Sequence, residues 1–594
     1  MSSLRKPGLG PIVGDTTHKT CRIWIRAGDP GDTNASLDED RRTVGVIGIV
    51  KGKKIDRAWY FRLQREFDRT GTFVVGKDVQ LGFYDDDFIK QSKPVPKPDD
   101  LPLKAQAIKL EANTTYTVRV GTLTIDDPMP NDASLPDWQL FERLPDIDKI
   151  KGELLGPTFN AEECEATFRT FPAPDTIGDN LSFLLGSCRY PGLLWKIKEA
   201  DRIFKPMADH LVDGPHGKAA RFTVMCGDQI YADEFNRFII GRADSFEEFQ
   251  QRYVAAYSAP NLRQLLRMSP TYMILDDHEI EDNWTQDRIY DVGKHKLFNL
   301  AIGAYQSYQW SHSPRTFGRL LYYTFACAGY PAFVLDTRTQ RSRDMLPGLE
   351  DNHMLGSPSL DIKNHPGQLE QLKRWLLDQH NSRGNAPKFI VSASVFAPND
   401  MSERIEPTPD DTKRAVDAGT ENIDDPFAKL WDTNVKRRND SDSWPAYPQT
   451  RLSILKHIVD NKIQNVVFLS GDIHCSNVAE IEFDGAQGKG LKAFSVTSSA
   501  FYWPFPFADG DPNSYVHDSR DPDQADPFPI VGTDAVMNYR SFGYTQEDNF
   551  TRIDIDRANA TMAVRVFNRD GDLVTVDDRD GNQTEQNVLK LAKW

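Results

Sequence analysis

The sequence predicts an α/β fold, chiefly because three apolar segments each end in an acidic turn. Residues 222–225, 272–275 and 466–469 have the length and composition of strands buried on both faces, as in a parallel sheet. The turns after them read Gly227-Asp228-Gln229-Ile230-Tyr231, Asp276-Asp277-His278-Glu279 and Gly471-Asp472-Ile473-His474. Ligands bind open α/β sheets at the carboxyl ends of the parallel strands. We therefore expect the three turns to meet at such an edge.

Each turn taken singly has a simpler interpretation. An Asp directly after a strand is most often a turn former or the N-cap of the next helix. Three such turns, each with a His or Tyr close by, are better explained together than as three separate caps. The convergence favours a joint metal site.

Residues 1–172 are predicted to form a separate β domain, in which polar and apolar side chains alternate as in half-buried strands. Tyr116 lies in a pattern that resembles the tyrosine corner of immunoglobulin-like sandwiches. Residues 173–594 alternate between strand-like and helix-like segments, which predicts the α/β domain. Within it, residues 398–448 are polar and Pro-rich, and we expect a lid or loop insertion there.

Composition narrows the class of protein. The chain has 594 residues and a formal net charge of −16, from 71 basic and 87 acidic residues, which disfavours binding to nucleic acid or anionic membranes. It has no apolar run of about 18 residues, so no membrane span is expected. The chain starts without an apolar signal segment and has six scattered cysteines, which together predict a cytoplasmic location. No pattern indicates an oligomeric state.

The acidic turns supply the donors that hard and borderline metal ions prefer. Asp228, Asp277 and Asp472 offer carboxylates, and His474 offers an imidazole. Tyr231 stands three residues after Asp228, so one helical turn would bring its phenol back to the same place. Cys188 ends a further apolar segment and could add a thiolate. A bridging carboxylate would let two cations sit about 3.5–4 Å apart and clamp a phosphoryl group.

In their order along the chain, these motifs resemble those of the alkaline phosphatase D family, the PhoD-like metallophosphoesterases. The motifs are Ser187-Cys188, Gly227-Asp228-x-x-Tyr231, Asp276-Asp277-His278-Glu279, Leu335-Asp336-Thr337-Arg338 and Gly471-Asp472-x-His474. The opening Gly10-Pro11-Ile12-Val13-Gly14-Asp15 is also similar to the start of that family's N-terminal domain. The resemblance implies a four-layer αββα metallophosphoesterase core behind a fibronectin- or immunoglobulin-like β-sandwich. It also implies a metal centre related to that of purple acid phosphatases.

Carried over to this chain, the resemblance makes Asp228 the bridging ligand of a binuclear or larger centre. The other ligands it implies are Cys188, Tyr231 and His474 at a ferric-like first site, and Asp277, Asp472 and the less certain Asn283 at a calcium-like second site. Asp276 would either bind metal or orient His278. Fe³⁺ with Ca²⁺ is therefore expected, with Mn²⁺ or Zn²⁺ as the alternatives. The small number of His ligands favours oxygen-loving ions over zinc.

His278 is the expected general acid, because it follows a candidate ligand and a His titrates near neutral pH. A structural His is the alternative. Arg189 and Arg338 are candidate phosphate clamps, since a guanidinium matches phosphate oxygens, and structural ion pairs are the alternative for both.

The predicted function is hydrolysis of small-molecule phosphate esters, both diesters and monoesters, by a metal-activated hydroxide at a binuclear site. The Gly-x-Ser-x-Gly motif of serine hydrolases is absent, which disfavours a covalent serine mechanism. Two alternatives remain: a phospholipase D-like diesterase of narrow specificity, and a non-catalytic binding protein that metal ions stabilise.

Overall fold

The structure is a computed structural model. It describes residues 3–28, 43–64, 67–76, 108–125, 143–174, 180–191, 197–233, 242–316, 320–342, 352–356, 366–399, 443–504 and 515–594. Most of the predicted insertion at 398–448 lies outside these residues.

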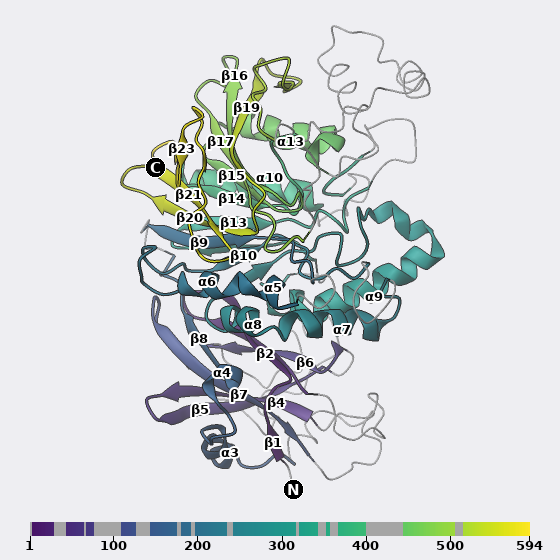
Figure 1. The fold of residues 1–594 in the computed structure, drawn as a ribbon, viewed down its shortest axis with the longest axis vertical. Coiled ribbons are helices and arrows are strands. Elements are labelled where there is room, and N and C mark those ends of the chain that lie inside the picture. Colours follow the sequence, from purple (N-terminus) through teal and green to yellow (C-terminus); the bar gives the residue numbers. More distant parts are fainter. Residues whose placement is uncertain are drawn as a thin grey trace.

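Two antiparallel sheets form the N-terminal part of the chain, at the bottom of Figure 1. One has the strand order β1-β7-β4-β5, with β8 paired to β7, and the other has the order β2-β3-β6. Ile23 and Phe73 of the smaller sheet share a core with Trp59 and Val118 of the larger one, so the sheets pack face to face. The elements are β1 (Ser3–Arg5), β2 (Leu9–Thr16), β3 (Cys21–Arg26), β4 (Thr43–Lys51), β5 (Lys54–Arg62), β6 (Thr70–Val75), β7 (Thr115–Thr124), α3 (Ile147–Leu154), α4 (Ala161–Cys164) and β8 (Glu165–Arg169).

The rest of the chain contains two larger sheets. The six-stranded sheet has the order β11-β10-β9-β20-β21-β24, and its first three strands are parallel. The eight-stranded sheet has the order β12-β13-β14-β15-β17-β16-β19-β18, with β13, β14, β15 and β17 parallel. The three acidic turns therefore do follow parallel strands, as the sequence predicts.

The strands of the six-stranded sheet are β9 (Leu181–Gly186), β10 (Thr223–Met225), β11 (Thr271–Met273), β20 (Asn549–Asp556), β21 (Thr561–Asn568) and β24 (Asn587–Lys590). Those of the eight-stranded sheet are β12 (Tyr323–Cys327), β13 (Tyr330–Val334), β14 (Lys388–Val391), β15 (Val466–Ser470), β16 (Ser476–Asp484), β17 (Lys492–Thr497), β18 (Phe528–Pro529) and β19 (Val536–Thr545). A small ladder joins β22 (Val576–Asp577) to β23 (Gln583–Thr584).

The two large sheets bury their facing sides against each other and their outer sides against helices. Phe183 of β9 packs edge-on against Phe389 of β14 at 5.2 Å between ring centroids. The next residue along β9, Leu184, belongs to the apolar cluster on the other side, with residues of the helices. In β15, Val467 faces the other sheet while Phe468 packs with residues of α10 and α13. This alternation explains why these strands are apolar throughout.

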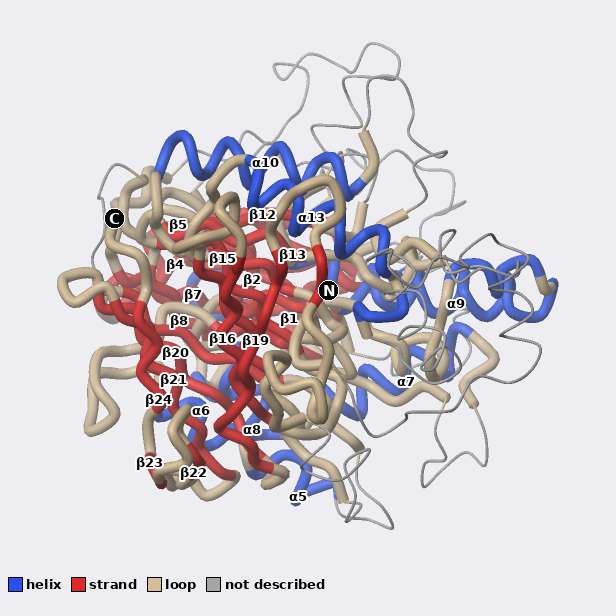
Figure 2. Tube along the Cα trace, turned by 90° about the horizontal axis from the view of Figure 1, so that it is seen from above, coloured by secondary structure: helices blue, strands red, loops and turns tan. Residues whose placement is uncertain are grey.

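Helices on the outer side of the six-stranded sheet are α5 (Ile197–Arg202), α6 (Phe204–Asp209), α7 (Phe246–Tyr257), α8 (Pro260–Leu266), α9 (Val292–Tyr308) and the short 3₁₀ helices η5 (Gln286–Tyr290) and η6 (Trp310–His312). The outer side of the eight-stranded sheet is covered by α10 (Gln368–Arg383), η10 (Trp444–Ala446) and α13 (Pro448–Asp460). Figure 2 shows α10 and α13 along one side of the strands and α5, α6 and α8 along the other.

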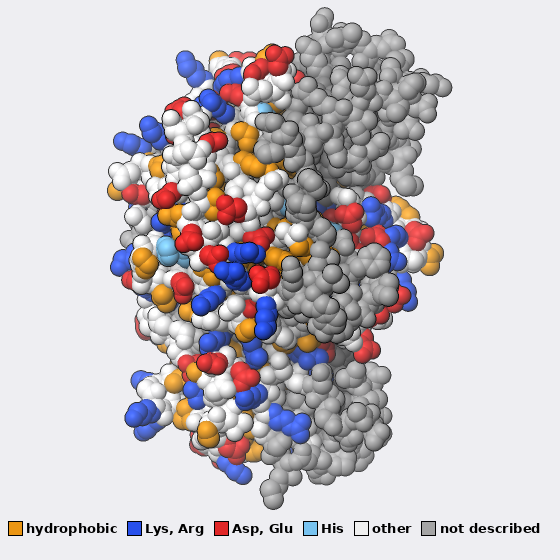
Figure 3. All heavy atoms as spheres, viewed as in Figure 1, with side chains coloured by type: hydrophobic (Ala, Val, Ile, Leu, Met, Phe, Trp, Pro, Cys, Tyr) orange, Lys and Arg blue, Asp and Glu red, His pale blue; other side chains and the backbone are white. Residues whose placement is uncertain are grey.

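Two further observations concern the surface. Acidic and basic side chains are interspersed over the described surface in Figure 3, so neither sign dominates this face. No helix among the described residues has the length and apolar character to cross a membrane.

The N-terminal sheets are joined to the helices below the six-stranded sheet by a buried tryptophan. Trp24 of β3 is fully buried, and its indole N–H donates to the carbonyl of Ser307 in α9 at 2.9 Å. Its ring lies 5.7 Å from that of Tyr308. Trp24 thus belongs to the apolar cluster of the α/β part rather than to that of its own sheet.

Replacing this residue should destabilise the whole chain. Trp24→Ala is expected to lower the free energy of unfolding by about 3–5 kcal/mol, because it removes a large buried ring. Trp24→Phe keeps a ring but loses the N–H donor, and it should cost less. Urea denaturation measures both variants. A Trp24→Ala protein as stable as wild type would contradict this account of the junction.

Candidate metal centre

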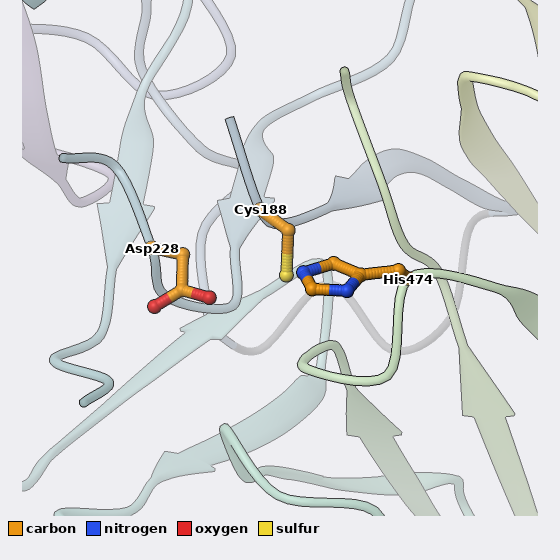
Figure 4. A group of neighbouring side chains, drawn as sticks. All are labelled: Cys188, Asp228 and His474. Carbon is orange, nitrogen blue, oxygen red and sulfur yellow. The ribbon is translucent and has the colours of Figure 1, made fainter. Parts of the chain in front are cut away.

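The two large sheets bring the predicted ligand turns to one place. The turn after β9 carries Cys188, the turn after β10 carries Asp228, and the turn after β11 carries Asp277. The turn after β15, in the other sheet, carries Asp472 and His474. Figure 4 shows the Cys188 sulfur, the Asp228 carboxylate and the His474 ring directed toward one another from separate turns.

Two glycines allow the turns to approach this closely. A Cβ atom at Gly471 would lie 2.2 Å from the hydroxyl oxygen of Ser187, so this glycine lets the β15 turn touch the β9 turn. At Gly227, whose φ is +101°, a Cβ atom would lie 2.3 Å from that of Asp276. A side chain at either position would clash with the neighbouring turn, so both positions require glycine.

Five residues of this region have φ angles that non-glycine residues rarely adopt. They are Cys188 (55°), Asp228 (54°), Asn283 (54°), Asp472 (74°) and His474 (53°). Such conformations cost about 1–3 kcal/mol each and concentrate at functional sites, where they aim side chains. All five are residues for which the sequence predicts metal binding.

Three overlapping groups of side chains could each hold a metal ion. Within each group the ligand atoms lie within 4.8 Å of one another. The groups are Cys188, Asp228 and His474; Asp228, Asp277 and His278; and Asp276, Asp277 and Asp472. Asp228 belongs to two of them, as expected of a bridging carboxylate. The Tyr231 hydroxyl lies 3.4 Å from Asp228 Oδ2 and 3.5 Å from His474 Nε2, so the phenol joins the first group.

Burial affects the protonation of these donors. Burial raises the pKa of the Cys188 thiol to about 12, although the hydroxyls of Ser187 and Ser499 lower it. Burial, with the charges of Cys188 and Asp276, also holds the pKa of Asp228 well above its usual value. Among the described residues, buried Asp228 Oδ1 and His474 Nδ1 have no hydrogen-bond partner. A bound cation would satisfy these atoms and favour the ionised thiolate and carboxylate.

His474 is suited to bind metal because it stays neutral. Burial and the charge of His278 lower the pKa of His474 to about 3. A neutral imidazole has a free lone pair for coordination. The Trp503 ring stacks on the imidazole at 3.6 Å between centroids and fixes its plane.

Comparison with known proteins identifies the family of this chain. A sequence model of the family described as PhoD-like phosphatase matches residues 201–556, more than half of the chain. The chain belongs to this family.

Relatives of this PhoD-like chain are distant. Alkaline phosphatase D of Bacillus subtilis (strain 168) is 23% identical over 342 residues, which cover 53% of this chain and 49% of that protein. The match therefore spans about half the length of that relative. A solved structure described as "Structure of PhoD" aligns over 99% of this chain and 93% of its own, with a TM-score of 0.55 and 16% identity. At that identity the likeness concerns the fold alone. A structure described as GAP50 of Plasmodium aligns over 70% of this chain and 90% of its own, with 8% identity and a TM-score of 0.31, too low for any argument.

His278 has a partner that sequence reasoning missed. Its Nδ1 lies 2.9 Å and 3.0 Å from the two carboxylate oxygens of Asp233. The sequence left open whether Asp276 orients His278, and in the structure Asp233 makes that contact instead. Burial lowers the pKa of His278, but the charges of Asp277, Asp228 and Asp233 outweigh it and raise the pKa well above its usual value. The only sign of this contact in the sequence was the presence of a second Asp, Asp233, five residues after Asp228.

Both candidate phosphate clamps of this PhoD-like chain have other contacts. The Arg189 guanidinium donates to the Ala256 carbonyl at 3.0 Å and lies over the Phe204 ring, which places it among the helices. The Arg338 Nε lies 2.5 Å from Asp276 Oδ1, and its guanidinium is fully buried among the acidic turns. These contacts of Arg189 are structural but are not ion pairs, whereas Arg338 makes the ion pairs of the alternative interpretation, beside the carboxylates.

Asn283 contacts the candidate ligand Asp277 through its backbone. Its N–H donates to Asp277 Oδ2 at 2.6 Å, while its side-chain amide lies 3.4 Å from the carboxylate of Asp282. Burial raises the pKa of Asp277, but Arg338, His278 and this amide together bring it below its usual value. Asn283 therefore keeps Asp277 oriented and ionised.

The turns themselves are held by a buried carboxylate, that of Glu279. It accepts the backbone N–H groups of Asp228 at 3.2 Å, Gln229 at 2.7 Å and Asp276 at 2.9 Å. The side-chain amide of Gln309, directly after α9, adds a fourth donor at 3.1 Å. One side chain thus fixes the Asp228 turn and the Asp276 turn relative to each other.

Removing this charge should weaken metal binding. Glu279→Gln replaces one acceptor oxygen by an amide donor that faces backbone N–H groups, so the turns should separate. Replacing a residue that orients metal ligands typically lowers metal affinity by about 10–100-fold, and we expect a loss of this size for Glu279→Gln. Competition with a chelator, followed by elemental analysis, measures this.

Glu281→Gln is the matched control. Glu281 is two residues further on and pairs with Arg242, Arg288 and Lys294 away from the turns. Its replacement should leave metal affinity unchanged. Equal affinities in wild type and Glu279→Gln would show that the turns hold their positions without this carboxylate.

Proposed function

We propose that this chain hydrolyses phosphate esters at a binuclear metal centre formed by the turns after β9, β10, β11 and β15. The observation that carries the proposal is the convergence of thiol, phenol, carboxylate and imidazole donors around Asp228, with buried atoms that lack partners. Membership of the PhoD-like phosphatase family supports phosphoester hydrolysis as the reaction class. We propose both diesters and monoesters as substrates.

The donor set fits two unlike cations. Cys188, Asp228, Tyr231 and His474 would hold the first, and their thiolate and phenolate favour Fe³⁺. Asp228, Asp277 and Asp472 would hold the second, and their oxygen ligands favour Ca²⁺. Bound ions would supply Lewis-acid activation of water and neutralise charge on the phosphoryl oxygens.

His278 is proposed as the general acid. The Asp233 carboxylate occupies its Nδ1, so Nε2 remains for proton transfer to the leaving-group oxygen. The acidic groups around the ring favour the protonated form, which a proton donor needs. Asp233 would act as its positioning residue, holding the ring in one orientation and one tautomer.

We also propose a fold type for each of the two parts of the chain. The packing of the two large sheets between helices supports a four-layer αββα core for residues 173–594. The two N-terminal sheets support an immunoglobulin- or fibronectin-like sandwich for residues 1–172, and the hydroxyl of Tyr116 accepts the N–H of Glu111 at 2.8 Å, as a tyrosine corner would.

The effect of removing the general acid on kcat should depend on the leaving group of the substrate. His278→Ala is expected to lower kcat by about 10²–10⁴-fold for a diester with an alkyl leaving group. The loss should be much smaller for a p-nitrophenyl diester, whose leaving group needs no proton. Steady-state hydrolysis of both substrates provides the test.

His295→Ala, at an exposed position of α9, is the control and should match wild type. Equal losses on both substrates would argue against proton donation by His278. Equal rates in wild type and His278→Ala would favour a non-catalytic binding protein.

The proposal that Tyr231 and Cys188 bind iron can be tested by visible absorption spectroscopy. A ferric ion bound to phenolate or thiolate absorbs visible light by charge transfer, so the purified protein should be coloured. Tyr231→Phe and Cys188→Ala should each shift or abolish the band. Tyr190→Phe is the control, because the Tyr190 ring packs 5.2 Å from Tyr231 outside the ligand set. An unchanged spectrum and iron content in Cys188→Ala would exclude the thiolate as a ligand.

A further inference from the structure

The end of α9 is fixed to the N-terminal part of the chain. The carbonyl of Ser307 accepts the indole N–H of Trp24 at 2.9 Å, and the hydroxyl of Tyr308 donates to the carboxylate of Asp68, which lies between β5 and β6. Arg26 of β3 donates to both oxygens of this carboxylate, at 2.6 Å from Nε to Oδ2 and 3.1 Å from Nη2 to Oδ1. Because all five residues are buried, water does not readily replace these contacts.

The residue directly after this helix reaches the ligand turns. Gln309 is fully buried, and its side-chain amide donates to Glu279 Oε1 at 3.1 Å and to the hydroxyl of Tyr253 in α7 at 3.2 Å. These two bonds use both hydrogens of the amide group. The Tyr253 ring in turn stacks on the Tyr308 ring, with 4.8 Å between centroids and 6° between planes. The position of Gln309 is therefore set by Glu279 on one side and by the stacked tyrosines on the other.

Glu279 is attached to the rest of the molecule mainly through this amide. Its Oε2 accepts the backbone N–H groups of Asp228 at 3.2 Å and Asp276 at 2.9 Å. Its Oε1 accepts the backbone N–H of Gln229 at 2.7 Å besides the amide of Gln309. Among the described donors, three thus belong to the turns that Glu279 holds, and only Gln309 belongs to the helices. Without Gln309, the buried carboxylate would be held only by the turns that it fixes.

We propose that Gln309 is a positioning residue for the Asp228 and Asp276 turns, and that the N-terminal sheets hold it in place through Tyr308. The N-terminal part of the chain then shapes the candidate site, although the candidate ligands come from the α/β part. This inference rests on the proposed function for the use of these turns, but not for their geometry. The competing explanation is a junction that only adds to the free energy of unfolding, so that weakening it leaves the turns as ordered as before.

Hydrogen exchange of the full chain, followed by mass spectrometry, tests the proposal, because it reports on backbone N–H groups without metal or substrate. Gln309→Met keeps the length of the side chain and removes both donors. Exchange in peptides covering residues 226–231 and 275–280 should become about 10–100-fold faster, the effect of losing one hydrogen bond to a charged group. Exchange in β14 and β15 should not change. An equal acceleration in β14 and β15 would indicate a loss of overall stability and would overturn the proposal.

Tyr308→Phe tests the link to the N-terminal sheets, and it is mild enough to serve if Gln309→Met does not fold. It removes the hydroxyl that donates to Asp68 and keeps the ring that stacks on Tyr253. Exchange in the same two peptides should become faster, by a smaller factor than in Gln309→Met. Tyr60→Phe is the matched control, because it removes a hydroxyl that donates to the Pro145 carbonyl at 2.8 Å within the N-terminal part. Turns that exchange at the wild-type rate in Tyr308→Phe would overturn the proposal.

The double variant shows whether Tyr308 acts through Gln309. If it does, adding Tyr308→Phe to Gln309→Met should accelerate exchange in the two turns no further. Additive effects would mean that the two residues act independently, and the proposal would be wrong. Hydrolysis of a phosphate ester is measured separately on the wild type. A wild-type protein without this activity would contradict the proposed function and leave the exchange result, and this inference, intact.

Discussion

The buried carboxylate of Glu279 is the contact on which the rest of the site depends. It accepts backbone N–H groups from the Asp228 turn and from the Asp276 turn, so it fixes the main chain of both. Backbone contacts of this kind hold whether or not metal is bound. The proposed ligands from the six-stranded sheet are therefore held in place by the protein itself, which would lower the cost of binding an ion.

The eight-stranded sheet completes the site through close contact of its β15 turn and through the buried ion pair between Arg338 and Asp276. Gly471 brings the β15 turn against Ser187, and the N–H of Cys188 donates to the carbonyl of Gly227 at 3.2 Å. These contacts join three turns from two sheets. The result is a set of donors whose burial, with a smaller contribution from their mutual repulsion, opposes ionisation, as the raised pKa values of Cys188 and Asp228 indicate. A cation bound among these donors would offset the cost of ionising them.

Local sequence pattern was enough to predict the strands and the turns that carry the ligands. Residues 222–225 and 466–469 are apolar throughout because their side chains alternate between two buried faces, and this pattern is visible without a structure. Asp228, Asp472 and His474 follow such strands directly, so their convergence could be inferred from topology. The change from alternating polar and apolar side chains near the N-terminus to strands that are apolar throughout was likewise visible in the sequence.

The partners of these residues could not be predicted, because they depend on contacts between turns. Nothing in the spacing of Asp233 indicates that it meets His278, and nothing distinguishes Glu279 as an acceptor of main-chain N–H groups. Arg189 and Arg338 look alike in sequence, each following a strand, yet one lies among helices and the other among carboxylates. Only the packing of one turn on another decides between such roles.

The central claim is that side chains from both large sheets surround paired cations at Asp228. Anomalous X-ray diffraction from crystals of the purified protein, recorded on both sides of the iron absorption edge, tests it most directly. The account predicts an iron peak within bonding distance of the Cys188 sulfur, the Asp228 carboxylate and the His474 ring, with a second ion across Asp228. A well-ordered crystal with no metal at these side chains, after soaking in iron and calcium, would contradict it.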